Sequence, residues 1–290
     1  MIQDPFPYRW QHPLPTMYDL PSEDPEEPGL PDEFHAFQPT LLSLTCRPTA
    51  VPREDCFTAQ DLNLYYDPRH PLWHKRPDWF LVIGANRVER QEALRLSYVV
   101  WQEGVMPFVV VELLSPGTEA EDLGQTLRVV DRPPTKWQVY EQILQIPYYM
   151  IYDRYTCTLR AFELTGGRYQ PLDLPEPKLW LERLGLGLGV WQGAYDGVMG
   201  QWLRWYDRAG VWVPTPEERA KQERQRAEQE GQRAEQERQR ADQALADLAA
   251  AQAAQLQAQE GAIARLLALG LTPQQVAAAL GLEDPPCPPF

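Results

Sequence analysis

Residues 109–114 read VVVELL, an apolar run interrupted only by Glu112. A continuous apolar run of this length is typical of a central strand that is covered on both faces of its sheet. A carboxylate is costly to bury there unless it is paired or binds a metal ion. The run therefore predicts the middle of a sheet and makes Glu112 a candidate functional residue.

Two further apolar segments flank this run. Residues 78–83 (DWFLVI) and 148–152 (YYMIY) are expected to be strands, and residues 135–144 (TKWQVYEQIL) are expected to form a helix with Thr135 as its N-cap. A strand–helix–strand order favours a right-handed crossover with parallel pairing. We therefore expect an α/β fold with a mixed central sheet flanked by helices. A further strand is expected at 62–66, and further strands or hairpins are expected at 158–164, 168–172 and 202–213, the last around a turn at 207–210.

The composition changes along the chain and predicts four parts. Residues 1–31, rich in Pro, Asp and Glu, are expected to be an acidic, extended lead-in. The α/β domain is expected over residues 32–215, opening with a short helix over 31–46 that has Asp32 near its start. A long polar helix is expected over 216–262, and a short helical hairpin and tail over 263–290.

The polar helix carries a seven-residue repeat, QERQRAE, QEGQRAE and QERQRAD, starting at Gln222. Its only regular apolar residue is Ala, whereas a strong coiled coil places Leu or Ile at two positions per heptad. We expect a solvated helix or a weak coiled coil. In the hairpin, two short helices are expected to meet at Gly270, and Thr272 with Pro273 opens the second. This second helix has no Lys or Arg, so base reading is not expected.

Charge and composition limit the classes of function. The formal net charge of −14 argues against nonspecific binding of nucleic acid over a wide basic face. The chain has no run of eighteen apolar residues and no visible secretory signal, so no membrane association and a cytoplasmic location are expected. The four cysteines and four histidines show no zinc-binding spacing.

Two other polar residues stand out beside apolar neighbours. Asp78 opens the strand at 78–83, and Lys136 lies in the first turn of the helix at 135–144. A cation is mildly unfavourable at a helix N-terminus, so another interaction is expected to hold Lys136 there. Two carboxylates on neighbouring strands can hold a hard divalent cation such as Mg²⁺, and a nearby ammonium can stabilise charge on a phosphoryl oxygen.

The sequence resembles a known family in several separated motifs. These are Pro77-Asp78 before an apolar strand, V-E-L-L-S-P-G-T at 111–118, a following Asp, K-x3-Y from Lys136 to Tyr140, and P-Y-Y-M-I-Y-D at 147–153. Together they are similar to the Uma-two family of endonucleases, expanded in cyanobacteria, within the PD-(D/E)XK restriction-nuclease superfamily. The resemblance covers about residues 20–215, and the polar helical tail also looks like that of many members.

The resemblance implies a restriction endonuclease-like core and a Mg²⁺-dependent DNA endonuclease, with Mn²⁺ as a possible substitute. Asp78 and Glu112 would bind the metal, and the backbone carbonyl of Leu113 would be a further ligand. Lys136 would be the catalytic lysine, moved to the helix because Leu114 occupies its usual place on the strand. Glu33 would be the accessory acidic residue, while Ser115 and Tyr140 would support the pocket. A homodimer is expected, since cutting both strands in one encounter needs two sites.

One departure from the family concerns the connection between Asp122 and Lys136. The stretch over 123–135 (LGQTLRVVDRPPT) is longer than the family's usual connection. It is expected to form a lid or a dimer contact, and it leaves open whether Lys136 reaches the metal.

Other readings of these residues stay open at this point. Asp78 and Glu112 also suit a strand-start cap and a buried carboxylate paired with Arg or Tyr. Lys136 also suits a surface lysine whose stem covers Trp137 or Tyr140, and Glu33 suits a helix-capping carboxylate. The alternative function is a noncatalytic interaction or scaffold protein that keeps the nuclease fold and oligomerises, or binds a partner helix, through its C-terminal helix. A two-carboxylate glycosidase is weaker because it leaves Lys136 unexplained.

Overall fold

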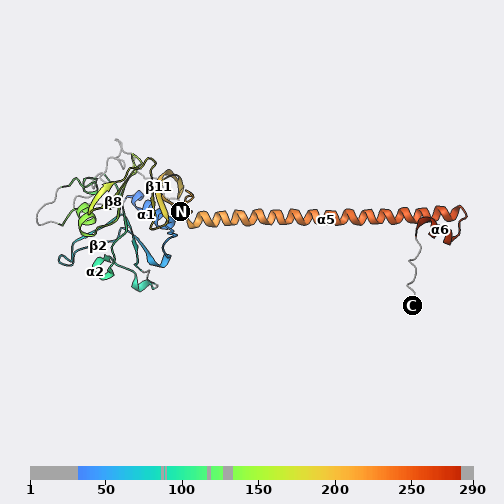
Figure 1. Ribbon diagram of the computed structural model, residues 1–290, viewed down its shortest axis with the longest axis horizontal. Coiled ribbons are helices and arrows are strands. Elements are labelled where there is room, and N and C mark those ends of the chain that lie inside the picture. The colour runs from blue at the N-terminus through green and yellow to red at the C-terminus, as the bar shows by residue number, and fades with distance from the viewer. Residues whose placement is uncertain (1–31, 86–87, 89, 116–118, 127–132, 282–290) are drawn as a thin grey trace, which may run out of the picture. The chain divides into compact units, whose positions relative to one another are not determined.

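The computed structural model describes residues 32–85, 88, 90–115, 119–126 and 133–281 (Figure 1). The expected lead-in over 1–31 lies outside the described residues. The chain divides into two compact units, residues 1–217 and 218–290, which are described separately below. The α/β fold class with a mixed central sheet, flanking helices and a long C-terminal helix is confirmed.

A six-stranded mixed sheet forms the centre of the first unit. Its strand order is β1-β4-β6-β7-β8-β9, with β6 parallel to β7 and the other neighbouring pairs antiparallel. The predicted parallel pairing across the 135–144 segment is therefore confirmed. The strands are β1 (Cys56–Gln60), β4 (Trp79–Ile83), β6 (Val109–Leu113), β7 (Tyr148–Asp153), β8 (Thr158–Thr165) and β9 (Arg168–Pro171).

Two small sheets accompany the central one. The first pairs β10 (Lys178–Leu181), β11 (Leu186–Tyr195) and β12 (Val198–Tyr206); the second pairs β3 (His74–Lys75), β2 (Leu64–Tyr65) and β5 (Tyr98–Val99). The hairpin expected over 202–213 around the turn at 207–210 is confirmed. β12 ends at Tyr206, and the turn after Asp207 returns the chain to a bridge between Tyr206 and Trp212. Residues 186–189 (LGLG) begin β11.

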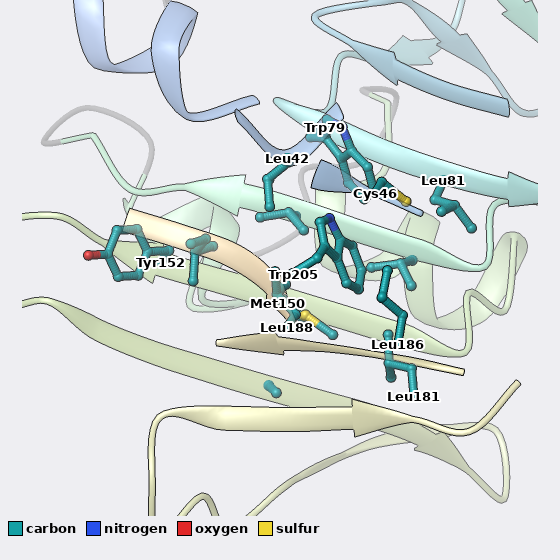
Figure 2. Packing of buried hydrophobic residues seen from close by; sticks show 14 of the residues in the cluster. Leu42, Cys46, Trp79, Leu81, Met150, Tyr152, Leu181, Leu186, Leu188 and Trp205 are labelled. Atoms are coloured by element: carbon teal, nitrogen blue, oxygen red, sulfur yellow. The ribbon is translucent and has the colours of Figure 1, made fainter. Parts of the chain in front are cut away.

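The central strands are buried on both faces, as the VVVELL run predicts. All five residues of β6 are buried. Val109, Val111 and Leu113 belong to a core that includes helix α1 (Glu33–Thr45) and the sheet of β10 to β12. Trp79 and Trp205 meet in this core with ring centroids 5.8 Å apart (Figure 2).

Helix α1 is fixed against β12 by a buried glutamine. The side-chain amide of Gln38 donates to the Leu203 carbonyl oxygen at 2.8 Å and accepts from the Leu203 N–H at 2.8 Å. Asp32 caps the helix, accepting from the His35 N–H at 3.0 Å. These contacts fix the first turn of α1, from which His35 projects.

The opposite face of the sheet carries the segment after the connection at 123–135. Val110 and Leu114 belong to this second core, together with Tyr140 and Tyr149. Thr135 caps α4 (Lys136–Gln138) in a capping box with Gln138, as predicted for Thr135. The single helix expected over 135–144 is wrong in detail, because the turn widens into a π-helix, η3 (Val139–Ile143). The remaining short elements are η1 (Arg53–Asp55), η2 (Gln91–Ala93), α2 (Val100–Glu103) and α3 (Glu119–Asp122).

Over residues 218–281, the part of the second unit that the structure describes, the chain forms two helices. Helix α5 (Pro216–Ala268) has 53 residues and no buried side chain, and Gly231 does not interrupt it. It passes through residue 262, so the first half of the expected hairpin is the end of α5. Thr272 caps α6 (Pro273–Leu280) with Pro273 in its first turn, as predicted. Among the described residues, no helix combines the length and apolarity needed to span a bilayer.

Candidate active site

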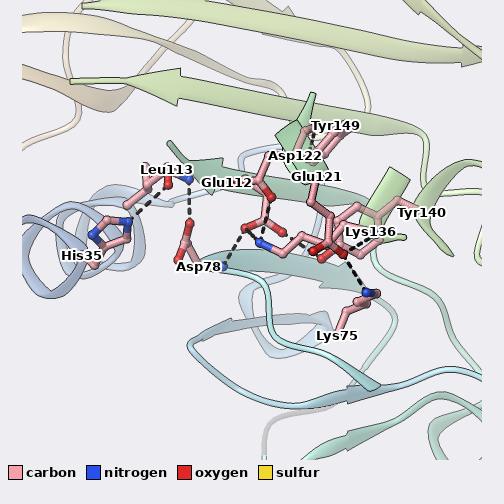
Figure 3. Close-up of polar contacts among 10 residues, drawn as sticks. All are labelled: His35, Lys75, Asp78, Glu112, Leu113, Glu121, Asp122, Lys136, Tyr140 and Tyr149. Carbon is pink, nitrogen blue, oxygen red and sulfur yellow. Dashed lines mark hydrogen bonds and ion pairs between the residues drawn. The ribbon is translucent and has the colours of Figure 1, made fainter. Parts of the chain in front are cut away.

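Glu112 lies at the centre of the site, on the face of β6 that turns toward α4 (Figure 3). Its side chain is fully buried. The Tyr140 hydroxyl donates to its Oε1 at 2.8 Å, and the Lys136 ammonium donates to its Oε2 at 3.1 Å. Side chains alternate across a strand, so the residue between Val111 and Leu113 is directed away from the first core. The pattern of the VVVELL run therefore aims this carboxylate at the helix that carries Lys136.

Asp78 precedes β4 and lies beside Glu112. Trp79 pairs with Val111 in antiparallel strands, so Asp78, just before Trp79, lies next to Glu112, just after Val111. The Asp78 N–H donates to Glu112 Oε2 at 3.4 Å, and Asp78 Oδ2 accepts from the Leu113 N–H at 2.6 Å. Two carboxylates from neighbouring strands thus converge, as the sequence predicts.

Lys136 is held at both ends by two consecutive carboxylates of α3. Its Nζ lies 2.8 Å from Asp122 Oδ1, and its backbone N–H donates to Glu121 Oε1 at 3.0 Å. The same Glu121 oxygen accepts from Lys75 Nζ at 2.8 Å. The long connection at 123–135 is therefore anchored beside the site at both ends, and Lys136 reaches Glu112 despite it. The lid or dimer role of that connection stays a prediction, and residues 127–132 lie outside the described part of the chain.

The carboxylates are destabilised in their charged form. Burial raises the pKa of Glu112 to about 7, and the nearby Asp78 adds to this rise while Lys136 opposes it. Burial also raises the pKa of Asp78, against the attraction of Lys136 and His35. For Lys136, burial alone would lower the pKa, but Glu112, Asp122 and Asp78 outweigh it and raise the pKa well above its ordinary value. The charged form of Lys136 is therefore favoured, whereas Glu112 and Asp78 are shifted toward their neutral forms.

His35 adds a group that the sequence did not single out as a site residue. Its Nδ1 lies 2.7 Å from Asp32 Oδ1, and its Nε2 lies 3.2 Å from the Leu113 carbonyl oxygen. Both partners are acceptors, so the doubly protonated imidazolium can donate to both. Although burial lowers its pKa, Asp78 and Asp32 outweigh burial and raise it. The raised pKa favours the imidazolium form of His35, which lies beside Asp78.

The predicted residues are distributed as follows. Asp78, Glu112, Leu113, Lys136 and Tyr140 meet at one place, but Glu33 is exposed in the first turn of α1 and its accessory role stays a prediction. Asp122, which the sequence does not mark as a site residue, is fully buried against Lys136. In the sequence Asp122 does not differ from its acidic neighbours at 119 and 121, because only its tertiary contact with Lys136 distinguishes it.

The donor set fits a hard divalent cation. The carboxylates of Asp78 and Glu112 and the backbone carbonyl of Leu113 supply oxygen atoms, the ligands that Mg²⁺ prefers, while Asp122 pairs with Lys136. Burial is the largest cause of the raised pKa of Glu112, and the Lys136 ammonium opposes this rise without cancelling it. Within the described ranges, no three Asp, Glu, His or Cys side chains are arranged to hold a metal by themselves. The ligand set expected from sequence accordingly contains two carboxylates and a backbone carbonyl.

Comparison with known proteins gives one family. A family model named Uma2 and described as "Putative restriction endonuclease" matches residues 6–194. The chain is also similar to a solved structure, a "putative nuclease belonging to DUF820 from Anabaena variabilis ATCC 29413", with 15% identity and a TM-score of 0.35, covering 53% of this chain and 75% of that one. No curated protein matches the chain.

Proposed function

The chain belongs to the Uma2 family, which confirms the resemblance to the Uma-two endonucleases, and on this premise we propose that it is a nuclease that hydrolyses phosphodiester bonds of DNA with the aid of Mg²⁺. The observation that carries the proposal is the convergence of Asp78, Glu112 and Lys136 from three separate segments. Phosphoryl transfer needs positioning and charge stabilisation, and this set of residues can supply both.

Each residue has a definite part in the proposed reaction. Asp78, Glu112 and the Leu113 carbonyl would hold the cation, which when bound lowers the pKa of a water and offsets charge on the phosphoryl group. Tyr140 fixes the Glu112 carboxylate through Oε1 and leaves Oε2 to the ammonium. Lys136 would then donate to the nucleophile or to a non-bridging phosphoryl oxygen.

Loading the site requires an exchange of partners. Lys136 holds Glu112 Oε2 and His35 holds the Leu113 carbonyl oxygen, both of which are proposed ligand atoms. Asp122 gives the ammonium a second acceptor at 2.8 Å, so Lys136 can release Glu112 without losing every charged partner. Asp122 would thereby keep the lysine next to the reacting phosphate.

Plasmid cleavage tests this proposal. Purified protein is incubated with supercoiled DNA and Mg²⁺ or Mn²⁺, alongside Asp78→Asn and Glu112→Gln. We expect nicking that needs the metal and falls by at least about a hundredfold in both variants, a loss typical of removing a key charged group from an active site. Cleavage that survives Glu112→Gln would remove the proposed site, and no cleavage of any nucleic acid by the wild type would remove the nuclease function.

The second candidate is a noncatalytic scaffold that assembles through its C-terminal helix, as a homodimer or with a partner helix. The net charge of −14 and the solvent-exposed α5 favour it. Light scattering on the full chain and on a chain ending at Pro214 tests it. A full-length dimer that becomes a monomer on truncation supports assembly through α5, whereas an unchanged molar mass removes that role.

A further inference from the structure

The turn after β7 lies at the same edge of the sheet as the candidate site. Strands β6 and β7 are parallel, and Leu113 pairs with Tyr152. The carboxyl ends of parallel neighbours meet at one edge, so Arg154 and Tyr155 follow directly beside the end of β6. These two residues have no part in the proposed chemistry.

A chain of short contacts joins Arg154 to the site. Its Nη2 lies 2.6 Å from Asp32 Oδ2, while Asp32 Oδ1 lies 2.7 Å from His35 Nδ1. The other nitrogen of His35 contacts the Leu113 carbonyl oxygen at 3.2 Å. The guanidinium is therefore three contacts away from an oxygen that we propose as a metal ligand.

Arg154 and Tyr155 form an ordered pair at the surface. The guanidinium carbon lies 4.7 Å from the centre of the Tyr155 ring, and Nη2 donates to the Tyr155 hydroxyl at 2.7 Å. Asp153 Oδ1 accepts from the Tyr155 N–H at 2.8 Å and fixes the turn. The Tyr155 side chain is nevertheless 67% exposed. An exposed aromatic residue that is held in place by a cation and a turn is suited to contact a ligand.

The chemistry of the pair fits a nucleic-acid strand. A guanidinium has five N–H donors in a fork that matches a phosphate, and both contacts described above use Nη2. An aromatic ring can stack on an unpaired base of any sequence. Because the chain carries a net charge of −14, a cation beside the site contributes more to binding a phosphate strand than one further cation would on a basic protein.

We propose that Arg154 and Tyr155 bind the nucleic-acid strand next to the bond that is cut, Arg154 contacting a phosphate and Tyr155 stacking on an unpaired base. This inference rests on the proposed nuclease function. The pair would supply the phosphate contacts that a broad basic face supplies in other nucleases, and would favour substrates with a single-stranded segment at the site.

Fluorescence anisotropy of the full-length chain tests the proposal. The probes are a fluorescein-labelled single-stranded DNA and the same sequence as a duplex, in Ca²⁺, which also takes oxygen ligands. We expect Tyr155→Ala to weaken single-strand binding about tenfold and duplex binding much less, while Tyr155→Phe, which keeps the ring, stays close to wild type. Arg154→Ala should weaken both about tenfold and make the salt dependence shallower by about one counterion.

Arg168→Ala is the matched control. Arg168 is an exposed cation at the opposite end of the sheet, since Thr165 pairs with Arg168 whereas Thr158 pairs with Asp153. It should leave both affinities unchanged, and thermal melts of each variant establish that the chain is folded.

The outcomes separate the two proposals. Plasmid cleavage by the wild type with unchanged affinities in folded Arg154→Ala and Tyr155→Ala would overturn this inference and leave the nuclease function standing. An equal loss of DNA affinity in Arg168→Ala would also overturn this inference, because it would show that any surface cation contributes equally. A wild type that neither cleaves nor binds either probe would overturn both proposals.

Discussion

Lys136 Nζ lies 2.8 Å from Asp122 Oδ1, although a connection of thirteen residues separates the two in the chain. Glu121 holds the backbone of the same lysine. Consecutive acidic residues thus fix both the main chain and the side chain of Lys136, and this explains how a lysine on a helix, instead of a strand, meets Glu112.

Replacing Lys136 should affect both activity and stability. In Lys136→Met, two buried carboxylates lose their ammonium, so the free energy of unfolding at pH 8 should fall by about 3–5 kcal/mol and nicking about a hundredfold or more. Lys75→Met is the matched control, because Lys75 is similarly buried but pairs with Glu121. Urea unfolding and plasmid nicking measure these effects. Equal loss of nicking in both variants would contradict a direct role for Lys136.

Glu112 should make the metal-free protein less stable as the pH rises. Its folded pKa of about 7 lies above its ordinary value of 4.5, so its contribution is fully favourable below pH 4.5 and is lost as the pH passes through 7. Urea midpoints of the wild type and of Glu112→Gln, measured without metal from pH 4.5 to 8, test this. As the pH rises, the midpoint of the wild type should fall relative to that of Glu112→Gln. A difference that does not depend on pH would contradict the raised pKa.

Mg²⁺ affinity should rise with pH, whereas the stability of the metal-free protein should fall. Glu112 must lose its proton to bind a cation, so the affinity should rise with pH up to about 7 and then level off. Calorimetric titration of the wild type at several pH values measures this dependence. Asp122→Asn should keep the same profile, since we do not propose Asp122 as a ligand, whereas pH-independent binding would place the cation elsewhere.

Two buried tyrosines donate to different kinds of acceptor, one to the Glu112 carboxylate and one to a neutral backbone carbonyl. Tyr140 donates to Glu112, whereas Tyr149 donates to the Asp122 backbone carbonyl at 2.9 Å. Tyr140→Phe should cost about 1.5–3 kcal/mol of unfolding free energy at pH 8 and Tyr149→Phe about 1 kcal/mol, because hydrogen bonds to charged groups are stronger. Only Tyr140→Phe should raise the pKa of Glu112 further, which the pH dependence of unfolding reports. Equal costs and profiles would contradict an ionised Glu112.

Much of the sheet could be predicted because its signal is local. The strands at 78–83, 109–114 and 148–152 are unbroken apolar runs, and caps such as Thr135 and Thr272 are set by neighbouring residues. Glu112 was recognisable because a carboxylate contrasts with five apolar neighbours. Strand β11 was missed, since alternating glycines at 187 and 189 carry no side-chain periodicity, and the four-residue strand β10 was missed as well.

The rest of the site depends on contacts that sequence does not encode locally. Asp122 lies in an acidic four-residue helix and becomes distinct only when Lys136 and the chain around Tyr149 bury it. His35 resembles an ordinary helix residue until α1 is fixed against β12 and brings its ring to Leu113. The widening of the helix after Gln138 likewise has no signal in its composition.

Anomalous diffraction from crystals soaked in Mn²⁺ tests the central claim most directly. A Mn²⁺ peak bound by Asp78, Glu112 and the Leu113 carbonyl, with Lys136 retained on Asp122, is the predicted result. Bound Mn²⁺ at a different place, or no peak between these oxygens in crystals with the site open to solvent, would contradict the account.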